Sequence, residues 1–376
     1  MTSNRLASAR RAVVKVGSNV LTVDSGLNLK AVAAVSRQIS RLMARGLEVI
    51  LVSSGAMASG LRKIGLSRRP DLIRERQAVA AVGQAGLIMA YEKAFNRHGK
   101  QVAQVLLTSD DLCNRERYLN GRNTLNTLLE WGVVPIINEN DTVKTEEIAV
   151  GDNDNLAAMI TLLMDADILI NLTDIDGLFT KDPRRFADAE LISEVRTLAK
   201  SIEQMASDIP GALGTGGMLS KIKAARKVTS AGIPMIIAAG LKHNILLRLF
   251  DGQPHGTYFV PKQDRLASRK SWIAFTLKPQ GVLCVDAGAA VALTDNGKSL
   301  LPSGITAVEG DFRVGAAVNL KTPDGRILGI GLVNYEAGDI RKIMGLKTRD
   351  ILPRLGAKPY DEIVHRDNLV ITANRL

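Results

Sequence analysis

The sequence predicts an α/β protein in which helices cover both faces of a mainly parallel sheet, followed by a smaller, mainly β domain. Two observations support this prediction. Over residues 1–260, short apolar runs alternate with longer segments of helical periodicity, which is typical of parallel strands buried on both faces. From about residue 279 the apolar runs are short and turn signals are frequent, as in β structure rich in hairpins.

The larger domain is expected to begin with a strand, AVVKVG, and a helix, LKAVAAVSRQISRLMARG, which Gly46 closes. A second strand, EVILVSSG, precedes a helical segment from about Asp71 to His98. Four further runs are predicted to be strands: QVAQVLLT, VVPIIN, DILINLT and PMIIAAG. In a sheet of this kind, ligands bind beyond the carboxyl ends of the strands.

Residues 261–278 begin with proline and are rich in Lys and Arg, so we expect a linker there. The second domain is expected over residues 279–370. Its Asn296-Gly297 and Asp324-Gly325 pairs are strong signals for hairpin turns.

The composition is that of an ordinary globular protein, because 46% of the 376 residues are hydrophobic and 23% are charged. The chain has only two cysteines, no signal-peptide core and no apolar span of ~18 residues, which predicts a cytoplasmic protein without a membrane segment. A net charge of +11 suits anionic substrates or nucleic acid, but surface solubility explains it equally well.

Polar residues gather just after four of the predicted strands, where the sheet would place a binding site. A single polar loop would be expected in any case. Polar residues after all four strands together favour a functional site. The residues concerned are Gly17, Ser18 and Asn19, Ser54 and Gly55, Asn138 and Asp141, and Thr173, Asp174 and Asp176.

Lys15 lies inside the apolar run VVKVG, where an unpaired charge would be expensive. A lysine in an edge strand could instead extend its ammonium group to solvent. We favour a lysine directed at a phosphate, because Gly17 follows it and the centre of a sheet leaves little room for such an extension.

The segment VGDNDNLAAMI places Asp152, Asn153, Asp154 and Asn155 at the start of an apolar helix. One of them is expected to be the N-cap, but a cap does not require four such residues. An EF-hand is excluded because the glycine and the later glutamate are not at the required spacing.

The segment GTGGMLSK indicates a glycine-rich loop that enters a helix, but it is not a Walker loop. Lys221 follows Gly217 by four residues, and the hydroxyl of Ser220 precedes the lysine instead of following it. The four histidines are scattered, and the chain has neither a Gly-x-Ser-x-Gly elbow nor a Gly-x-Gly-x-x-Gly after the first strand. The scattered histidines form no metal-ligand cluster, and the missing motifs disfavour hydrolase and dehydrogenase functions.

Taken in order, VVKVGSNVL, VSSGAMASG, PIINENDTV, VGDNDNLAA, LTDIDGLFTKDPR and GTGGMLSKIKAA resemble the motif series of the glutamate 5-kinases in the amino-acid kinase family. Residues 280–370 are similar to the PUA domain that follows many bacterial glutamate kinases. The resemblance implies a three-layer sandwich of the amino-acid kinase type over residues 1–260 and a PUA domain over 279–370. It also implies that ATP and L-glutamate, with Mg²⁺, give L-glutamate 5-phosphate and ADP in the first step of proline biosynthesis.

The resemblance implies a role for individual residues. Lys15 and Lys221 would bind the phosphates, and Asp154 would organise these lysines. L-glutamate would be held by Ser54, Gly55, Asp141 and Asn153. ATP would be held by Lys15, Thr173, Asp174, Thr215, Gly216, Gly217, Met218, Leu219, Ser220 and Lys221. No protein metal site is expected, because Mg²⁺ would be held mainly by ATP. Ser220 stands where the family usually has threonine; the hydroxyl remains, so the ATP contacts are expected to survive.

The resemblance also implies partners. Proline would be a feedback inhibitor at or near the glutamate site, the kinase domains would form dimers or tetramers, and the product would pass to glutamate 5-phosphate reductase.

Two alternatives remain. Another amino-acid kinase would act on a different carboxylate or phosphate. An RNA-binding role would rest on the PUA domain. The aromatic residues Phe312 and Tyr335 are isolated there, and positive charge alone does not identify a nucleic-acid-binding surface. A regulatory or assembly role for that domain is favoured.

Overall fold

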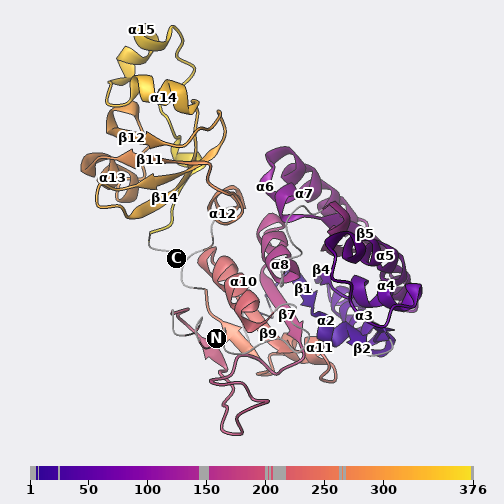
Figure 1. Ribbon diagram of the computed structural model, residues 1–376. Helices are drawn as coiled ribbons and strands as arrows, with labels where there is room; N and C mark the ends of the chain where they lie inside the picture. Colours follow the sequence, from indigo (N-terminus) through magenta and orange to yellow (C-terminus); the bar gives the residue numbers. More distant parts are fainter. Residues whose placement is uncertain are drawn as a thin grey trace. The chain divides into compact units, whose positions relative to one another are not determined.

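The structure of the protein is a computed structural model (Figure 1). It describes residues 6, 8–23, 26–143, 152–199, 202, 205, 217–261, 265 and 268–373. The chain divides into two compact units, Met1–Asp264 and Arg265–Leu376. Within the described residues, none of the helices combines the length and the apolar character that a membrane span needs.

The first unit is built on a sheet whose described strands run in the order β5-β6-β4-β1-β7-β9-β10-β8. Every neighbouring pair is parallel except β9 and β10. The strands are β1 (Arg11–Val16), β4 (Glu48–Ser53), β5 (Val102–Leu107), β6 (Val134–Glu139), β7 (Ile168–Thr173), β8 (Glu194–Val195), β9 (Met235–Ala239) and β10 (Thr257–Phe259). Strand β1 is central, and the chain builds outward through β4 on one side and β7 on the other, so a switch point lies at the carboxyl end of β1.

Helices cover both faces of this sheet (Figure 1). One face packs α8 against β1, β4, β6 and β7, and α10 packs against α8; α3 lies on the other face with α5 and α11. The helices are α2 (Ser18–Leu21), α3 (Leu29–Ala44), α4 (Ala56–Ile64), α5 (Ile73–Asn96), α6 (Ser109–Cys113), α7 (Arg115–Glu130), α8 (Asp152–Leu163), α10 (Met218–Ser230) and α11 (Ile245–Phe250). The predicted α/β architecture is confirmed.

Local sequence signals set the ends of these elements. Asn28 caps α3 by accepting a hydrogen bond from the Ala31 amide, and Gly46, at φ 89°, follows the end of that helix. Thr108 and Asp111 form a capping box at the start of α6. Short elements β2 (Thr22–Val23), β3 (Gly26–Leu27) and η1 (Asp141–Val143) complete the connections near the carboxyl edge of the sheet.

The second unit contains a sheet in the order β12-β11-β13-β14-β15. Its strands are β11 (Gly281–Val285), β12 (Ile305–Glu309), β13 (Ala317–Lys321), β14 (Ile327–Leu332) and β15 (Leu369–Ile371), and its helices are α12 (Ser268–Phe275), α13 (Ala287–Thr294), α14 (Ala337–Ile343) and α15 (Ile351–Leu355). The Asp324-Gly325 hairpin is confirmed, because this turn joins antiparallel β13 and β14.

Two expectations for this unit need correction or completion. The prediction of a hairpin at Asn296-Gly297 is wrong, because the preceding segment AGAAVALT forms helix α13. Asp286 caps this helix by accepting a hydrogen bond from the Ala289 amide. Alanine favours a helix once a cap is present. The segment predicted as a linker, residues 261–278, contains α12, which packs against β14 and β15 and buries Trp272 and Ile273.

Helices α4 and α5 approach so closely that two positions have no space for a side chain. A Cβ on Gly83 would overlap the carbonyl oxygen of Ala56, and a Cβ on Gly60 would overlap that of Val79. The close approach positions the start of α4, which directly follows Ser54 and Gly55.

We expect Gly83→Ala to destabilise the protein by about 1–3 kcal/mol, because the added methyl group must push two packed helices apart. Gly121→Ala is the matched control, since Gly121 lies in α7 with open space around it. There the better helix propensity of alanine should leave stability unchanged or raise it by about 0.5–1 kcal/mol. Urea unfolding of both variants measures the difference, and equal midpoints would contradict the close packing.

Candidate active site

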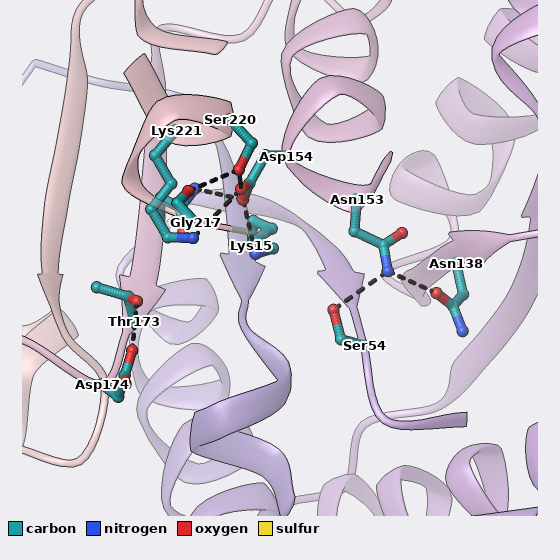
Figure 2. Close-up of polar contacts among 11 residues, drawn as sticks. Lys15, Ser54, Asn138, Asn153, Asp154, Thr173, Asp174, Gly217, Ser220 and Lys221 are labelled. Atoms are coloured by element: carbon teal, nitrogen blue, oxygen red, sulfur yellow. Dashed lines mark hydrogen bonds and ion pairs between the residues drawn. The ribbon is translucent and has the colours of Figure 1, made fainter. Parts of the chain in front are cut away.

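A buried carboxylate, that of Asp154 in the first turn of α8, is the centre of the candidate active site. Its Oδ1 accepts from Lys15 Nζ at 2.6 Å and from Asn171 Nδ2 at 2.8 Å. Its Oδ2 accepts from Ser220 Oγ at 2.5 Å and from Lys221 Nζ at 3.3 Å. Figure 2 shows Lys15, Ser220 and Lys221 converging on this carboxylate.

The sheet register explains why these side chains meet. Lys15 in β1 lies opposite Asn171 in β7, and paired residues of parallel strands project to the same face. Their neighbours Val14 and Ile170 belong to the core on the α3 face, so Lys15 and Asn171 project toward α8. Lys221 comes from the first turn of α10, which packs against α8.

The three charged groups at this centre are almost completely buried. The side chains of Lys15 and Lys221 are each 6% exposed and that of Asp154 is 0% exposed. Burial opposes ionisation of Asp154, but the two lysines and the hydrogen bonds from Lys15 and Ser220 outweigh it and hold the pKa of Asp154 below its usual value. Burial and the like charge of Lys221 lower the pKa of Lys15, although Asp154 acts in the opposite direction.

A second carboxylate, that of Asp174, lies at the carboxyl ends of β1 and β7. Asp174 accepts from Asn19 Nδ2 at 2.9 Å and from the adjacent Thr173 Oγ1 at 3.0 Å. Burial works to raise the pKa of Asp174, but these two hydrogen bonds bring it below its usual value. Glycine at position 17 keeps this edge open, since a Cβ there would lie 3.3 Å from the carbonyl oxygen of Leu172 and 3.7 Å from Lys15 Nζ.

A separate polar group surrounds Asn153, the residue before Asp154. Asn153 Nδ2 donates to Ser54 Oγ at 3.1 Å and to Asn138 Oδ1 at 3.0 Å. Ser54 follows β4, and Asn138 lies in β6. Figure 2 shows the two consecutive side chains of α8 pointing to different partners, Asn153 to this group and Asp154 to the lysines. Asn153 Oδ1 is buried and has no donor among the described residues.

The other predicted glutamate-binding residues lie at the same edge of the sheet. Gly55 precedes α4 with φ 103°, a backbone conformation that favours glycine. Asp141 begins η1, with one residue between it and the end of β6, and its charge acts on Arg69.

The predicted ATP-binding segment is described only in part, because Thr215 and Gly216 lie outside the described residues. Gly217 precedes α10, and its carbonyl oxygen accepts from Ser220 Oγ at 2.8 Å. Met218 is buried and Leu219 is half-buried at the start of the helix.

Sequence reasoning missed Asn171, which donates directly to Asp154. The available signal was a single polar residue inside the apolar run DILINLT, the same signal that drew attention to Lys15. Its Oδ1 is also buried without a donor in the described part of the chain.

Comparison with known proteins decides the family. Residues 10–239 match the amino acid kinase family, and residues 281–354 match the PUA domain. A glutamate 5-kinase from Syntrophus aciditrophicus is 51% identical over 374 residues, which are 99% of this chain and 97% of that protein. The chain belongs to the glutamate 5-kinase group of the amino acid kinase family. The resemblance drawn from the motifs is therefore confirmed.

Other similarities accompany this match. A glutamate 5-kinase from Caldanaerobacter subterraneus subsp. tengcongensis is 50% identical over 362 residues, which are 96% of this chain and 97% of that protein. Among solved structures, a UMP kinase from Bacillus anthracis is 14% identical and covers 69% of this chain and 99% of its own, with a TM-score of 0.48.

We expect Asp154→Asn to destabilise the folded protein by about 3–5 kcal/mol, because it leaves buried ammonium groups without their shared carboxylate. Asp251→Asn is the control, since its ion pair with Arg45 is about half exposed and should contribute no more than about 1 kcal/mol. Urea unfolding at neutral pH measures both.

The pH dependence supplies a second readout of the same change. The pKa of Asp154 is lower in the folded state than in the unfolded state, so ionised Asp154 stabilises the folded protein. This stabilisation is present in full above about pH 5. It is lost as the pH falls below the unfolded-state pKa of about 3.9 towards the folded-state pKa. The stability gap between the wild-type protein and Asp154→Asn should therefore narrow on acidification. A difference in unfolding free energy that does not change with pH would contradict an ionised Asp154 in the folded protein.

Proposed function

We propose that the protein transfers the γ-phosphoryl group of ATP to the side-chain carboxylate of L-glutamate, giving L-glutamate 5-phosphate and ADP, as the first step of proline biosynthesis. The observation that carries the proposal is the Asp154 centre, where two buried lysines meet at the carboxyl edge of the sheet. Asn153, the adjacent residue, donates to the neutral polar side chains of Ser54 and Asn138. Family membership supports the same reaction.

The chemistry of the reaction fits a site made of fixed cations. A glutamate side-chain carboxylate has a pKa of about 4.3 and is already ionised at neutral pH, so the nucleophile needs no general base. The obstacle is repulsion between the carboxylate and the phosphates, together with charge that develops on the transferred group. Lys15 and Lys221 would offset that charge, and Asp154 would hold both ammonium groups in place before the phosphates arrive.

The proposed binding residues divide between two sides of α8. Ser54, Gly55, Asp141 and Asn153 would hold L-glutamate. The buried Asn153 Oδ1, which has no donor among the described residues, could accept from its ammonium group. Thr173 and Asp174 would hold ATP beyond β7. The remaining ATP contacts would come from Thr215, Gly216, Gly217, Met218, Leu219, Ser220 and Lys221.

Mg²⁺ fits this site as a companion of ATP and not as a metal bound by the chain alone. Both oxygens of Asp154 already accept hydrogen bonds from Lys15, Asn171, Ser220 and Lys221. No three His, Cys, Asp or Glu side chains within the described ranges are placed to hold a metal ion. The phosphates would therefore supply most ligands, and the ion would neutralise their charge.

The proposal extends to regulation and assembly. L-proline would inhibit at or near the glutamate site, the kinase unit would form dimers or tetramers in the cytoplasm, and the acyl phosphate would be consumed by glutamate 5-phosphate reductase. We assign the PUA domain a regulatory or assembly role and not RNA binding as the main function.

The proposed reaction is tested by ADP release from Mg²⁺-ATP with L-glutamate, L-aspartate, N-acetyl-L-glutamate or no acid, with hydroxylamine present to trap acyl phosphate. Glutamate-dependent ADP release with γ-glutamyl hydroxamate, suppressed by L-proline, is the expected result. Activity with another acid alone would keep the kinase and overturn the substrate. Inactivity of folded, ATP-binding protein with every acid would overturn the reaction and favour the RNA-binding alternative.

We expect Lys15→Ala and Lys221→Ala each to lower kcat by ~10²-fold or more, since each removes a cation that acts where negative charge develops. Lys93→Ala, on the exposed surface of α5, is the control and should keep wild-type turnover. Steady-state ADP release measures the three variants, and circular dichroism confirms that they are folded. Near-normal turnover of a folded Lys15 or Lys221 variant would exclude the assigned role.

A further inference from the structure

Two arginines near the start of α5 have no role in the reaction described so far. Arg69 precedes α5 and Arg76 lies in its first turn, and both side chains are half-buried. The Nε of each is buried and has no hydrogen-bond partner in the described part of the chain. Arg69 forms no hydrogen bond or ion pair with any described residue, whereas Arg76 donates only from Nη2, to the carbonyl oxygen of Asp71 at 2.9 Å.

Arg69 lies within electrostatic reach of both Arg76 and Asp141. Burial lowers the pKa of Arg69, the positive charge of Arg76 lowers it further, and Asp141 opposes both. Like charges that are held together and partly removed from water are unfavourable unless an anion joins them. A planar guanidinium group with free N–H donors is suited to a carboxylate.

The arginine pair, Arg69 and Arg76, lies toward the proposed glutamate pocket. Helix α5 packs against η1, which begins with Asp141. Further along α5, Gln84 Nε2 donates to the carbonyl oxygen of Glu139 at 3.4 Å, which connects the helix to the end of β6. The preceding residue of β6, Asn138, accepts from Asn153.

An α-amino acid carries an ammonium and a carboxylate group on one carbon atom. A receptor for this head group needs an anion and a cation near each other, and Asp141, at the start of η1 where it packs against α5, would provide them together with the arginine pair. We propose that Arg69 and Arg76 bind the α-carboxylate of an amino acid whose ammonium group faces Asp141. The assignment rests on the proposed function, because it orients the substrate with its side-chain carboxylate toward the Asp154 centre.

The test compares L-glutamate with L-isoglutamine, in which a neutral amide replaces the α-carboxylate. Wild-type protein, Arg69→Gln, Arg76→Gln and the control Arg74→Gln are assayed for ADP release with both acids. Arg74 lies in the same turn of α5 but is exposed. We expect the KM for L-glutamate to rise about 10- to 100-fold in the Arg69 and Arg76 variants, as for the loss of a hydrogen bond to a charged group.

The KM for L-isoglutamine should be high in the wild-type protein and change little in the variants, because the lost partner is already absent from that substrate. An unchanged KM for ATP shows that each variant is folded, and Arg69→Lys, which keeps the charge, should recover part of the loss. Equal rises in KM for both acids, or no rise in either KM together with an unchanged inhibition constant for L-proline, would overturn the role of the pair. If the wild-type protein phosphorylates neither acid, it is the proposed function that fails.

A second arm identifies which amino acid uses the site. Inhibition of glutamate phosphorylation by L-proline is measured in the same variants. A rise in the inhibition constant together with the KM for glutamate assigns both molecules to one carboxylate site. A rise in the inhibition constant alone assigns the pair to the inhibitor, and a rise in KM alone assigns it to the substrate.

Discussion

The arrangement of the site depends on one buried interaction, the carboxylate of Asp154 between two lysine ammonium groups. Removing three charges from water is expensive, and the Coulombic attraction among them repays that cost only with close geometry and further hydrogen bonds. Asn171 and Ser220 supply those hydrogen bonds. Because Lys15, Asp154 and Lys221 come from β1, α8 and α10, the same contacts fix the position of two helices on the central strand.

The first turn of α8 contributes a side chain to each of the two polar groups of the site. Asn153 and Asp154 are consecutive residues, and a helix turns by roughly 100° per residue, so their side chains point to separate groups (Figure 2). The positive end of a helix dipole also favours anions at this turn. Lys221 lies in the first turn of α10, so two helix N-termini add their fields to those of the lysines at the place proposed for the phosphates.

Much of this fold and part of the site could be predicted from the sequence. Buried parallel strands give continuous apolar runs, and a charge such as Lys15 inside one of them is visible because it is expensive. Asn171 gives the same signal more weakly, since a neutral amide is less costly to bury than a charge. Its importance depends on the register of β1 and β7, which no local pattern reveals. The error at Asn296-Gly297 has a related cause, because a turn dipeptide predicts a hairpin only when strands flank it.

The sheet assigns the two proposed ligands to different elements. The proposed nucleotide side would be built from the ends of β1 and β7 and the start of α10, whereas the proposed amino-acid side would be built from the ends of β4 and β6 and the start of α5. Charges near Asp141 can change without removing a hydrogen bond from Asp154, since the described donors to Asp154 are Lys15, Asn171, Ser220 and Lys221. The buried ion-paired charges of Lys15, Asp154 and Lys221 belong to the proposed phosphate side, where a fixed position matters most. The half-buried arginines would belong to the side that must admit and release a small zwitterion.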